Sequence, residues 1–254
     1  MTTIEEVLTS AATLGLDRLD AQLLLLQALN RRAHERTWLL AHDGDTLSEA
    51  ESVGFRDLVR RRLAGEPVAY LTGRKEFFGL DLQVDARVLV PRPDTETLVE
   101  WAIERLDGLP HEGTVLDLGT GSGAVAPAIK HARRQARVSA LDFSADALAV
   151  ARANALQLQL DVSFSQGCWL DGVTGRFDLI LSNPPYIAAA DPHLAALIHE
   201  PLQALASGAD GLDDIRTIIR EASGHLNPGG WLLMEHGFDQ AGKVRQLLVD
   251  AGWS

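Results

Sequence analysis

The sequence of 254 residues contains a single cysteine, Cys168, so no internal disulfide can form and no cysteine-rich zinc site can be completed. It also contains no uninterrupted run of the ~18 apolar residues that a membrane-spanning helix needs. Residues 1–15 lack the basic and then apolar pattern of a secretion signal. These absences predict a protein that stays in the reducing cytoplasm and has no membrane partner.

The sequence also contains fewer basic than acidic side chains. The chain has 23 Lys and Arg against 35 Asp and Glu, which gives a formal charge of −12. Residues 1–80 hold 10 basic and 12 acidic side chains, whereas residues 81–254 hold 13 and 23. Because an acidic surface releases no counterions from a phosphate backbone, we expect no stable nucleic-acid binding. The basic cluster Arg60-Arg61-Arg62 is more typical of a solvated helix face than of a binding patch.

Apolar residues, by contrast, are plentiful enough for a core. Hydrophobic residues make up 46% and charged residues 23% of the sequence, and the mean hydropathy is 0.00. This balance excludes a disordered chain. A length of 254 residues fits one large domain or two unequal ones, and the change of pattern along the chain favours two.

The first part of the chain has the pattern of a small helical bundle. Apolar residues recur at helical spacing over residues 4–63, and Pro67 and Gly73 end this pattern. Residues 77–90 then contain two short extended runs, FFGLDL and RVLV, around a polar turn, which predicts a β-hairpin. We therefore expect a helical domain in residues 1–74, a hairpin linker in 75–91 and a second domain in 92–254.

The second domain alternates strands and helices after Gly113, which is typical of a parallel sheet covered on both faces. A helix at residues 95–106 precedes it. The sequence predicts strands at 114–118, 137–141, 162–166, 177–182 and 231–236. Further helices are predicted at 124–134, 145–157, 213–225 and 239–251, with a turn at 227–230 before the last strand. The fold class is therefore α/β with a mainly parallel sheet.

The first predicted strand runs into a glycine-rich turn, DLGTGSGA, at residues 117–124. Its glycines let a ligand approach the backbone closely, and the start of the following helix favours negative charge. Gly119, Gly121 and Ala124 satisfy the G-x-G-x-x-A spacing of a dinucleotide site. A nicotinamide oxidoreductase is therefore one candidate, and a plain tight turn without a ligand is another.

Two side chains after the next strands could complete a nucleoside site. Asp142 lies 23 positions after Gly119, where a carboxylate can accept hydrogen bonds from both ribose hydroxyls, and Ser144 could cap the next helix without it. Trp169 follows the third strand, where its indole could stack on adenine or pack at a rim. Cys168 offers no carboxylate to the adenine amino group, and its thiol is expected to be inert packing.

The fourth predicted strand ends in Asn183-Pro184-Pro185-Tyr186. Two prolines stiffen this turn and orient the side-chain carbonyl of Asn183 and the backbone carbonyl of Pro184 toward one point, where both can accept from an NH2 group. With Tyr186 stacked on that group, the nitrogen lone pair would be aimed at an electrophilic methyl. A hydride-transfer enzyme has no need of this device, so the tetrapeptide favours methyl transfer to nitrogen.

With these residues, the chain resembles the S-adenosylmethionine-dependent methyltransferases of the HemK type, which modify a glutamine side-chain nitrogen. The resemblance covers nearly the whole chain through its helical first domain and the tracts GEPVAYLTGRKEFFGLDLQV, VLVPRPDTE, LDLGTGSGA, NPPY and MEHG. It implies a Rossmann-like class I methyltransferase domain preceded by a helical substrate-recognition domain. It also implies cofactor contacts at Gly119, Thr120, Gly121, Ser122, Gly123, Asp142, Trp169 and Asn183.

The resemblance further implies a reaction and a partner. S-Adenosylmethionine would give its methyl group to N5 of the glutamine in the Gly-Gly-Gln loop of peptide chain release factors, which tunes translation termination and leaves S-adenosylhomocysteine. Asn183, Pro184 and Tyr186 would be catalytic, and these residues together with Pro185 would bind the substrate glutamine. We expect a one-step transfer that needs no metal, carried out by a monomer.

Three alternatives stay open. NPPY also occurs in methyltransferases that act on the amino groups of adenine or guanine in DNA or RNA, although the acidic second domain disfavours a nucleic-acid substrate. The second alternative is a methyltransferase that acts on a glutamine of a ribosomal protein, although the tract Arg92-Pro93-Asp94-Thr95-Glu96 is similar to the release-factor branch. Arg92, Asp94 and Glu96 could also simply brace the hairpin. An inactive protein-binding module is the third alternative.

Two departures from the family pattern carry expectations. Leu197-Ile198-His199 stands before Glu200 where family members have a longer stretch with an arginine, so the substrate-side loop should differ in shape. Family members continue past Trp253 with two further antiparallel strands that are missing from this sequence. We therefore expect the strand at 231–236 or its neighbour to have an unpaired edge and an uncovered apolar face, at a cost in stability.

Overall fold

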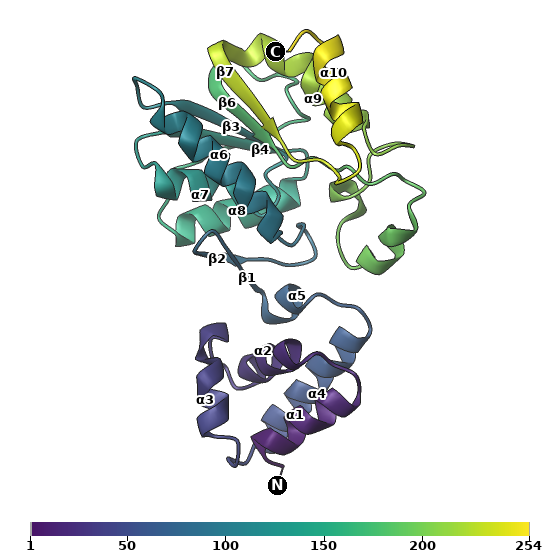
Figure 1. Ribbon diagram of the computed structural model, residues 1–254. Helices are drawn as coiled ribbons and strands as arrows, with labels where there is room; N and C mark the ends of the chain where they lie inside the picture. The colour runs from purple at the N-terminus through teal and green to yellow at the C-terminus, as the bar shows by residue number, and fades with distance from the viewer. Residues whose placement is uncertain (1, 254) are drawn as a thin grey trace. The chain divides into compact units, whose positions relative to one another are not determined.

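The chain forms two compact units in this computed structural model, which describes residues 2–253, and the boundary between the units follows Arg74 (Figure 1). The first unit is helical, as the sequence predicts. It contains α1 (Ile4–Thr13), α2 (Arg18–Ala28), a 3-10 turn at Ala33–Glu35, α3 (Arg36–Ala41), α4 (Glu49–Leu63) and α5 (Val68–Thr72).

Local capping explains where the longer helices of this unit begin. Thr3 and Glu6 cap α1 by exchanging hydrogen bonds with each other's backbone N–H, and Ser48 and Glu51 do the same for α4. Each such cap contributes about 1 kcal/mol. The apolar positions of all five helices then meet in one core, whose buried members include Ile4, Val7, Leu24, Leu25, Leu26, Leu39, Phe55, Val59 and Leu71.

A two-stranded hairpin follows, formed by β1 (Arg74–Phe77) and β2 (Leu80–Gln83). Its turn consists of Phe78 and Gly79, whose φ angles are 50° and 75°. Two-residue hairpin turns need such positive φ angles because the resulting twist matches that of the strands. The turn therefore lies inside the run FFGLDL, which the sequence prediction treated as one strand.

The predicted second strand of the hairpin, RVLV at 87–90, is wrong. Asp85 accepts a hydrogen bond from the backbone N–H of Arg87 at 3.0 Å, and the resulting tight turn stops the chain from pairing as a strand. Instead, the backbone N–H of Val90 donates to the carboxylate of Glu200 at 3.0 Å. The apolar side chains that suggested a strand are buried in a loop.

The second unit contains the predicted five-stranded parallel sheet and confirms the α/β class. In space the strands follow the order β5-β4-β3-β6-β7. They are β3 (Thr114–Leu118), β4 (Arg137–Asp142), β5 (Ser163–Gln166), β6 (Phe177–Ser182) and β7 (Leu226–Met234). The helices are α6 (Glu96–Asp107), α7 (Val125–Ala132), α8 (Ala145–Gln157), α9 (Asp213–Ala222) and α10 (Ala241–Asp250). Short 3-10 turns lie at Pro93–Thr95, Pro192–Leu197, Leu202–Ala204 and Ser223–His225.

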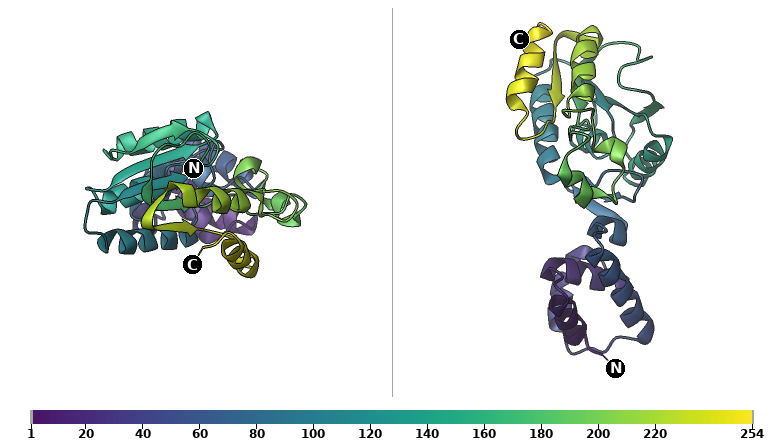
Figure 2. Two further views of the ribbon diagram at one scale, coloured as in Figure 1. Left: turned by 90° about the horizontal axis from the view of Figure 1, so that it is seen from above. Right: turned by 90° about the vertical axis from the view of Figure 1, so that its right-hand side faces the viewer.

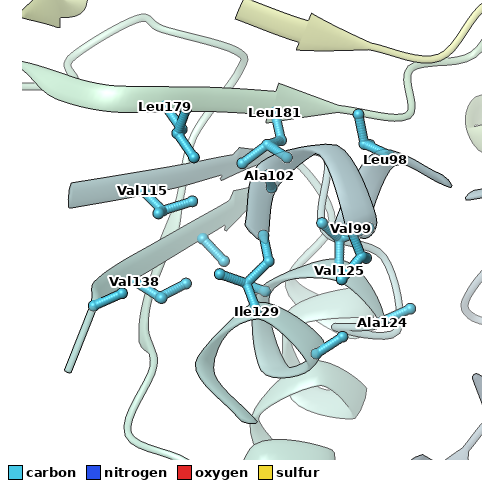
Figure 3. Close-up of a cluster of buried hydrophobic side chains, with 14 of the residues drawn as sticks. Leu98, Val99, Ala102, Val115, Ala124, Val125, Ile129, Val138, Leu179 and Leu181 are labelled. Atoms are coloured by element: carbon cyan, nitrogen blue, oxygen red, sulfur yellow. The ribbon is translucent and has the colours of Figure 1, made fainter. Parts of the chain in front are cut away.

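Helices cover both faces of this sheet, with α6, α7 and α8 on one face and α9 with α10 on the other (Figures 1 and 2). Alternate strand residues point to opposite faces, so Val115, Leu179 and Leu181 pack against α6 and α7 (Figure 3). Leu116 and Ile180 pack on the α9 side. Both faces of the central strands β3 and β6 are therefore buried, which explains why these strands are largely apolar.

The last strand differs from its prediction at both ends. β7 spans 226–234 rather than 231–236, and residues 227–230, which were predicted as a turn, form its irregular first part. Gly229 has a φ of 79°, and Asn227 donates to the carboxylate of Asp178 at 2.8 Å, which anchors the irregular stretch to β6. A strand start rich in proline and glycine is compatible with such an interruption of the ladder.

The expectation for the edge strand is met in part. β7 stands at the end of the sheet order, and no strand among residues 2–253 pairs with its outer edge. Its faces are covered in part, because Leu233 belongs to the core under α6 and Leu232 and Met234 pack with Val244 of α10, whereas Trp231 is 47% exposed. The expected uncovered apolar face is therefore limited to Trp231. Within the same residues, no helix has the length and apolar character needed to cross a membrane.

One buried side chain of α8 joins the hairpin to the glycine-rich turn. Asn154, which is fully buried, accepts from the backbone N–H of Gln83 at 2.7 Å and donates to the carbonyls of Gln83 and Ser122, each at 2.9 Å. Gln157, one helical turn later, also bonds the hairpin, through Asp81 and Gln83, but at an exposed position.

We predict that Asn154→Ala lowers the free energy of unfolding by ~3 kcal/mol, because it leaves buried backbone groups without partners. Gln157→Ala, the matched control, should cost less than ~1 kcal/mol because water replaces its partners. Urea titration of both variants tests this difference. Equal losses would show that burial of the Asn154 amide is not what stabilises the junction.

Candidate active site

The functional side chains gather where the parallel strands end. The register pairs Leu118 of β3 with Leu141 of β4 and with Ser182 of β6, and pairs Ser182 with Met234 of β7. The segments that leave these strands therefore start at one level. A cavity of about 300 Å³ opens at this edge, within the size range of small-molecule sites. Its walls include residues 87–89, Gly119, Gly121, residues 141–144, residues 167–169, Asn183, Pro185, Pro201 and Asp214.

The glycine-rich turn uses its own N–H groups internally. Gly119 and Thr120 both donate to the carbonyl of Leu141 at 2.9 Å, and Gly121 donates to the carboxylate of Asp142 at 2.8 Å. A pyrophosphate at a helix start is normally held by such N–H groups. In this turn they already have partners, so the geometry removes the main reason for a dinucleotide site.

A buried carboxylate lies directly beneath this turn. Asp117, only 2% exposed, accepts from the hydroxyl of Thr120 at 2.6 Å and from the N–H of Ala126, in the first turn of α7, at 3.3 Å. Burial raises the pKa of Asp117 to about 6, and the neighbouring charge of Asp142 acts in the same direction. One carboxylate thus lies at the positive end of α7 and a second, Asp142, lies at the turn before it, which disfavours an anionic ligand and suits a cationic one.

Asp142 keeps capacity to bind a ligand. One of its oxygens accepts from Gly121, and the other accepts from the N–H of Ser144 at 2.9 Å. A carboxylate offers about four acceptor positions, so two remain for ribose hydroxyls. Burial raises the pKa of Asp142 above its ordinary value. Ser144 itself caps α8, by accepting from the N–H of Ala147, which confirms that the cap does not need Asp142.

Trp169 is held at the cavity wall by two constraints. Its indole N–H donates to the carboxylate of Asp214 at 2.9 Å, and its ring lies so close to Gly119 that a Cβ there would sit 3.3 Å from it. The backbone of Trp169 has a φ of 49°, which costs of order 1 kcal/mol for a residue other than glycine. The indole therefore stands fixed over the glycine-rich turn. Asp214, which fixes it, lies 45 residues further along the chain, so no local sequence pattern indicates this contact.

Two neighbouring wall residues differ from what the sequence suggested. Cys168 is exposed in the cavity wall, so the expectation of a packed thiol is wrong. Phe143, next to Asp142, is 68% exposed and also lines the cavity. Its position directly after the last residue of β4 could have drawn attention to it, because a large apolar side chain left in water at a cavity often contacts a ligand.

Asn183 and Tyr186 of the NPPY turn are both linked to the carboxylate of Glu235, which directly follows β7. The Asn183 side-chain NH2 donates to the hydroxyl of Thr95 at 3.0 Å, and Thr95 donates to Glu235 at 2.7 Å. The Tyr186 hydroxyl donates to the other oxygen of Glu235 at 3.1 Å. Burial and the charge of Glu235 raise the pKa of Tyr186 to about 12, so the phenol stays protonated at neutral pH.

The backbone of the same turn is clamped from the loop after β7. Gln240 donates to the carbonyl of Tyr186 at 2.9 Å, and its side-chain oxygen accepts from the N–H of Gly237 at 2.8 Å. Gly211 passes so close that a Cβ there would lie 2.2 Å from the same carbonyl, and its φ is 76°. Only glycine fits at that position, so the NPPY turn has little freedom to move.

The PRPDTE tract braces the loops around the cavity. Glu200, with a nearly buried side chain, accepts from the guanidinium of Arg92 at 2.5 Å as well as from Val90. Glu96 accepts from the N–H of Phe78 at 3.0 Å, which confirms that it braces the hairpin. For Asp94 no such contact with the hairpin is seen among the described residues. Arg92 thus joins the segment before α6 to the loop that carries Pro201.

The structure brings six of the residues assigned to the site into the cavity wall, namely Gly119, Gly121, Asp142, Trp169, Asn183 and Pro185. The others are absent from the wall of this cavity. Thr120 and Ser122 are buried, and Gly123 has a φ of 75° and packs so tightly that a Cβ would lie 3.0 Å from Ala151. Pro184 is buried, and Tyr186 reaches Glu235.

Comparison with protein families matches both parts of the chain. Residues 2–73 match the PrmC N-terminal domain, and residues 95–211 match the methyltransferase small domain. The release factor glutamine methyltransferase of Xylella fastidiosa is 51% identical over 249 residues, which cover 96% of this chain and 89% of that protein. The enzyme of the same name from Yersinia pestis is 47% identical and covers 92% and 84%.

Solved structures support the fold. A methyltransferase from Pyrococcus furiosus has 23% sequence identity and a TM-score of 0.52, covering 77% of this chain and 87% of its own. A methyltransferase from Agrobacterium tumefaciens, at 15% identity, gives a TM-score of 0.53 over 71% of this chain and 58% of that one. Both share the methyltransferase architecture with this chain, which confirms the Rossmann-like class.

The buried Asp117 should make stability depend on pH in an unusual direction. Its pKa is raised from 3.8 to about 6, so its favourable contribution is present below pH ~4 and is lost as the pH rises through ~6. Asp117→Asn removes this titration. We predict that the free energy of unfolding of the variant, relative to the parent, rises by ~3 kcal/mol between pH 4 and pH 7.

Urea titrations across this pH range test the prediction, with Asp178→Asn as the control. Burial alone would raise the pKa of Asp178, but hydrogen bonds from Asn227 and Thr114 outweigh it and hold the pKa below its ordinary value. The control should therefore show no such rise. A flat difference for Asp117→Asn would mean that the buried carboxylate does not destabilise the fold at neutral pH.

Proposed function

Since the chain belongs to the family of release factor glutamine methyltransferases, we propose that it methylates the side-chain amide nitrogen of the glutamine in the Gly-Gly-Gln loop of peptide chain release factors. The methyl donor is S-adenosylmethionine. The proposal rests mainly on one observation. The NPPY turn lies beside a cavity, and in the glycine-rich segment at that cavity two carboxylates accept hydrogen bonds from backbone N–H groups. Such a cavity suits a nucleoside with a positive charge.

The residues of the cavity fit S-adenosylmethionine. Asp142 supplies acceptors for the two ribose hydroxyls, and Gly121 leaves space against the backbone. The carboxylates of Asp117 and Asp142 complement the positive charge of a sulfonium group. When bound, this cofactor supplies a methyl group activated by that sulfonium. Trp169, fixed by Asp214, and the exposed ring of Phe143 are the aromatic surfaces available to adenine.

The NPPY turn prepares the substrate nitrogen. Asn183 gives its NH2 to Thr95, so its side-chain oxygen is available to accept from the substrate amide. With the backbone carbonyl of Pro184 as second acceptor, both amide hydrogens are held. An amide nitrogen is a weak nucleophile because its lone pair is delocalised. Holding the two hydrogens while the ring of Tyr186 stacks on the group localises that pair on nitrogen.

Tyr186 does not act as the base in this reaction. Its pKa of about 12 and its hydrogen bond to Glu235 keep its proton in place at neutral pH. Rate enhancement then comes from positioning and from fixed acceptors, and the amide proton leaves to water after the transfer. Gln240 and Gly211 contribute by keeping the backbone of the turn still.

We assign recognition of the release factor to the helical domain, residues 1–74, and catalysis to residues 92–254, with the hairpin region 75–91 between them. The match of residues 2–73 to the family's N-terminal domain supports the first assignment. The excess of acidic side chains supports a protein rather than a nucleic-acid substrate. We further propose that the protein works as a monomer.

Cofactor binding should protect Cys168, the only cysteine of the chain, from alkylation, because its thiol is exposed in the cavity wall. Asp142→Ala should weaken S-adenosylmethionine at least about tenfold, which corresponds to the loss of charge-assisted hydrogen bonds. The rate of Cys168 alkylation against cofactor concentration measures this affinity. If saturating cofactor leaves the alkylation rate unchanged, the cofactor does not occupy this cavity.

Removal of the Asn183 amide should affect the chemical step. We predict that Asn183→Ala lowers kcat for methyl transfer to a release factor by ~10²-fold or more, about 2.7 kcal/mol, with a much smaller change in cofactor affinity. Transfer of labelled methyl groups measures this. Asn227→Ala is the matched control, since this asparagine bonds Asp178 away from the cavity. A loss of affinity with an unchanged kcat would contradict the role given to Asn183.

A further inference from the structure

The NPPY turn is connected to the rest of the sheet edge through three hydrogen bonds, two of which end on one carboxylate, that of Glu235. They run from Asn183 to Thr95 at 3.0 Å, from Thr95 to Glu235 at 2.7 Å and from Tyr186 to Glu235 at 3.1 Å. Thr95 is 4% exposed and precedes α6, whereas Glu235 directly follows β7. Four side chains from three distant segments thus form one network, in which Glu235 is shared.

The direction of each hydrogen bond follows from the chemistry of the groups. An ionised carboxylate can only accept, so the single hydrogen of the Thr95 hydroxyl goes to Glu235. The oxygen of Thr95 then offers only lone pairs to Asn183. The amide of Asn183 must therefore turn its NH2 toward Thr95. Its carbonyl oxygen is left facing away from Thr95, as acceptance of a substrate NH2 requires.

Without this constraint the amide could adopt either orientation. A hydroxyl whose hydrogen is not donated to another acceptor can donate to the amide oxygen as easily as it accepts from the amide NH2. A flipped Asn183 would point its NH2 at the substrate NH2, so that two donors face each other. The site would then lose one of its two acceptors, although its shape would hardly change.

We infer that Glu235 and Thr95 are positioning residues, which fix the orientation of the Asn183 amide so that it presents its oxygen to the substrate. Because the hydrogen bonds to Glu235 involve a charged acceptor, they are stronger than neutral ones. The second oxygen of the same carboxylate holds the Tyr186 hydroxyl. The carboxylate of Glu235 therefore fixes the orientation of both polar side chains of the NPPY turn, Asn183 and Tyr186. This inference rests on the proposed methyl transfer.

Thr95 is the position at which the inference is tested most sharply. Thr95→Val has nearly the same shape but no hydroxyl, and we expect it to lower kcat at least about tenfold while KM for the release factor changes less than about threefold. Thr95→Ser restores a hydroxyl and should recover most of that loss. The split between kcat and KM, together with the recovery, separates positioning from a merely structural role.

A double variant tests whether Glu235 acts through Thr95. Glu235→Ala should also lower kcat, and Glu235→Ala with Thr95→Val should lose no more than Glu235→Ala alone, because one relay is broken in both. Protection of Cys168 by the cofactor shows in each variant that the cavity is intact. If Thr95→Val keeps its kcat, or if the two losses multiply, the inference is wrong.

The matched control is a similar network at the opposite end of the sheet. Thr114 donates to Asp178 at 2.8 Å, and Asn227 donates to the other oxygen of that carboxylate at 2.8 Å. Thr114→Val removes a comparable hydrogen bond, so it should lower stability and leave kcat within about twofold. A tenfold loss of kcat in this control would show that general destabilisation explains the Thr95 result.

A spectroscopic readout needs no methyl transfer and so separates this inference from the proposed function. The side-chain amide of Asn183 gives a pair of ¹H–¹⁵N resonances, which Asn183→Ala identifies by their disappearance. Glu235→Ala and Thr95→Val should both shift this pair, whereas Thr114→Val should not. Unchanged resonances in Glu235→Ala would overturn the relay. Failure of the parent protein to label any release factor would count against the proposed function alone.

Discussion

The whole site depends on the register of four parallel strands. Because β3, β4, β6 and β7 are paired so that Leu118, Leu141, Ser182 and Met234 stand level, the residues that follow them reach the same edge. A slip of one residue in any strand would turn its side chains to the other face. The apolar side chains buried on both faces hold that register, and Figure 3 shows those on the face covered by α6 and α7. The chemistry at the edge is therefore a consequence of core packing.

Carboxylates give this edge its character. Asp117 binds the start of α7 and Asp142 binds the glycine-rich turn before it, where a dinucleotide enzyme would bind phosphate. The burial that raises the pKa of Asp117 lowers stability at neutral pH, a cost that active sites commonly carry. At the far side of the same edge, Glu235 organises the NPPY turn. Negative charge thus flanks the place where a cationic cofactor is proposed to meet a neutral amide.

Much of this arrangement could be predicted from the sequence, because it is encoded in local patterns. Strand and helix alternation gave the parallel sheet, and Asp142 and Asn183 were recognised because each follows a strand end. The hairpin strand at 87–90 was wrong because apolar content alone does not show that Asp85 makes a turn. The contacts of Thr95 with Glu235 join residues 140 positions apart, which no local pattern reveals. The signal that could indicate this contact is that Thr95 stands at the start of α6 and Glu235 at the end of β7.

The most direct test of the account is to locate the transferred methyl group. A release factor incubated with the protein and S-adenosylmethionine should be digested and sequenced by tandem mass spectrometry, beside the same factor with its loop glutamine changed to alanine. The account predicts one added methyl on the side-chain nitrogen of the glutamine in the Gly-Gly-Gln loop, and none in the altered factor. A methyl group on any other residue, or on DNA or RNA offered in parallel, would contradict it.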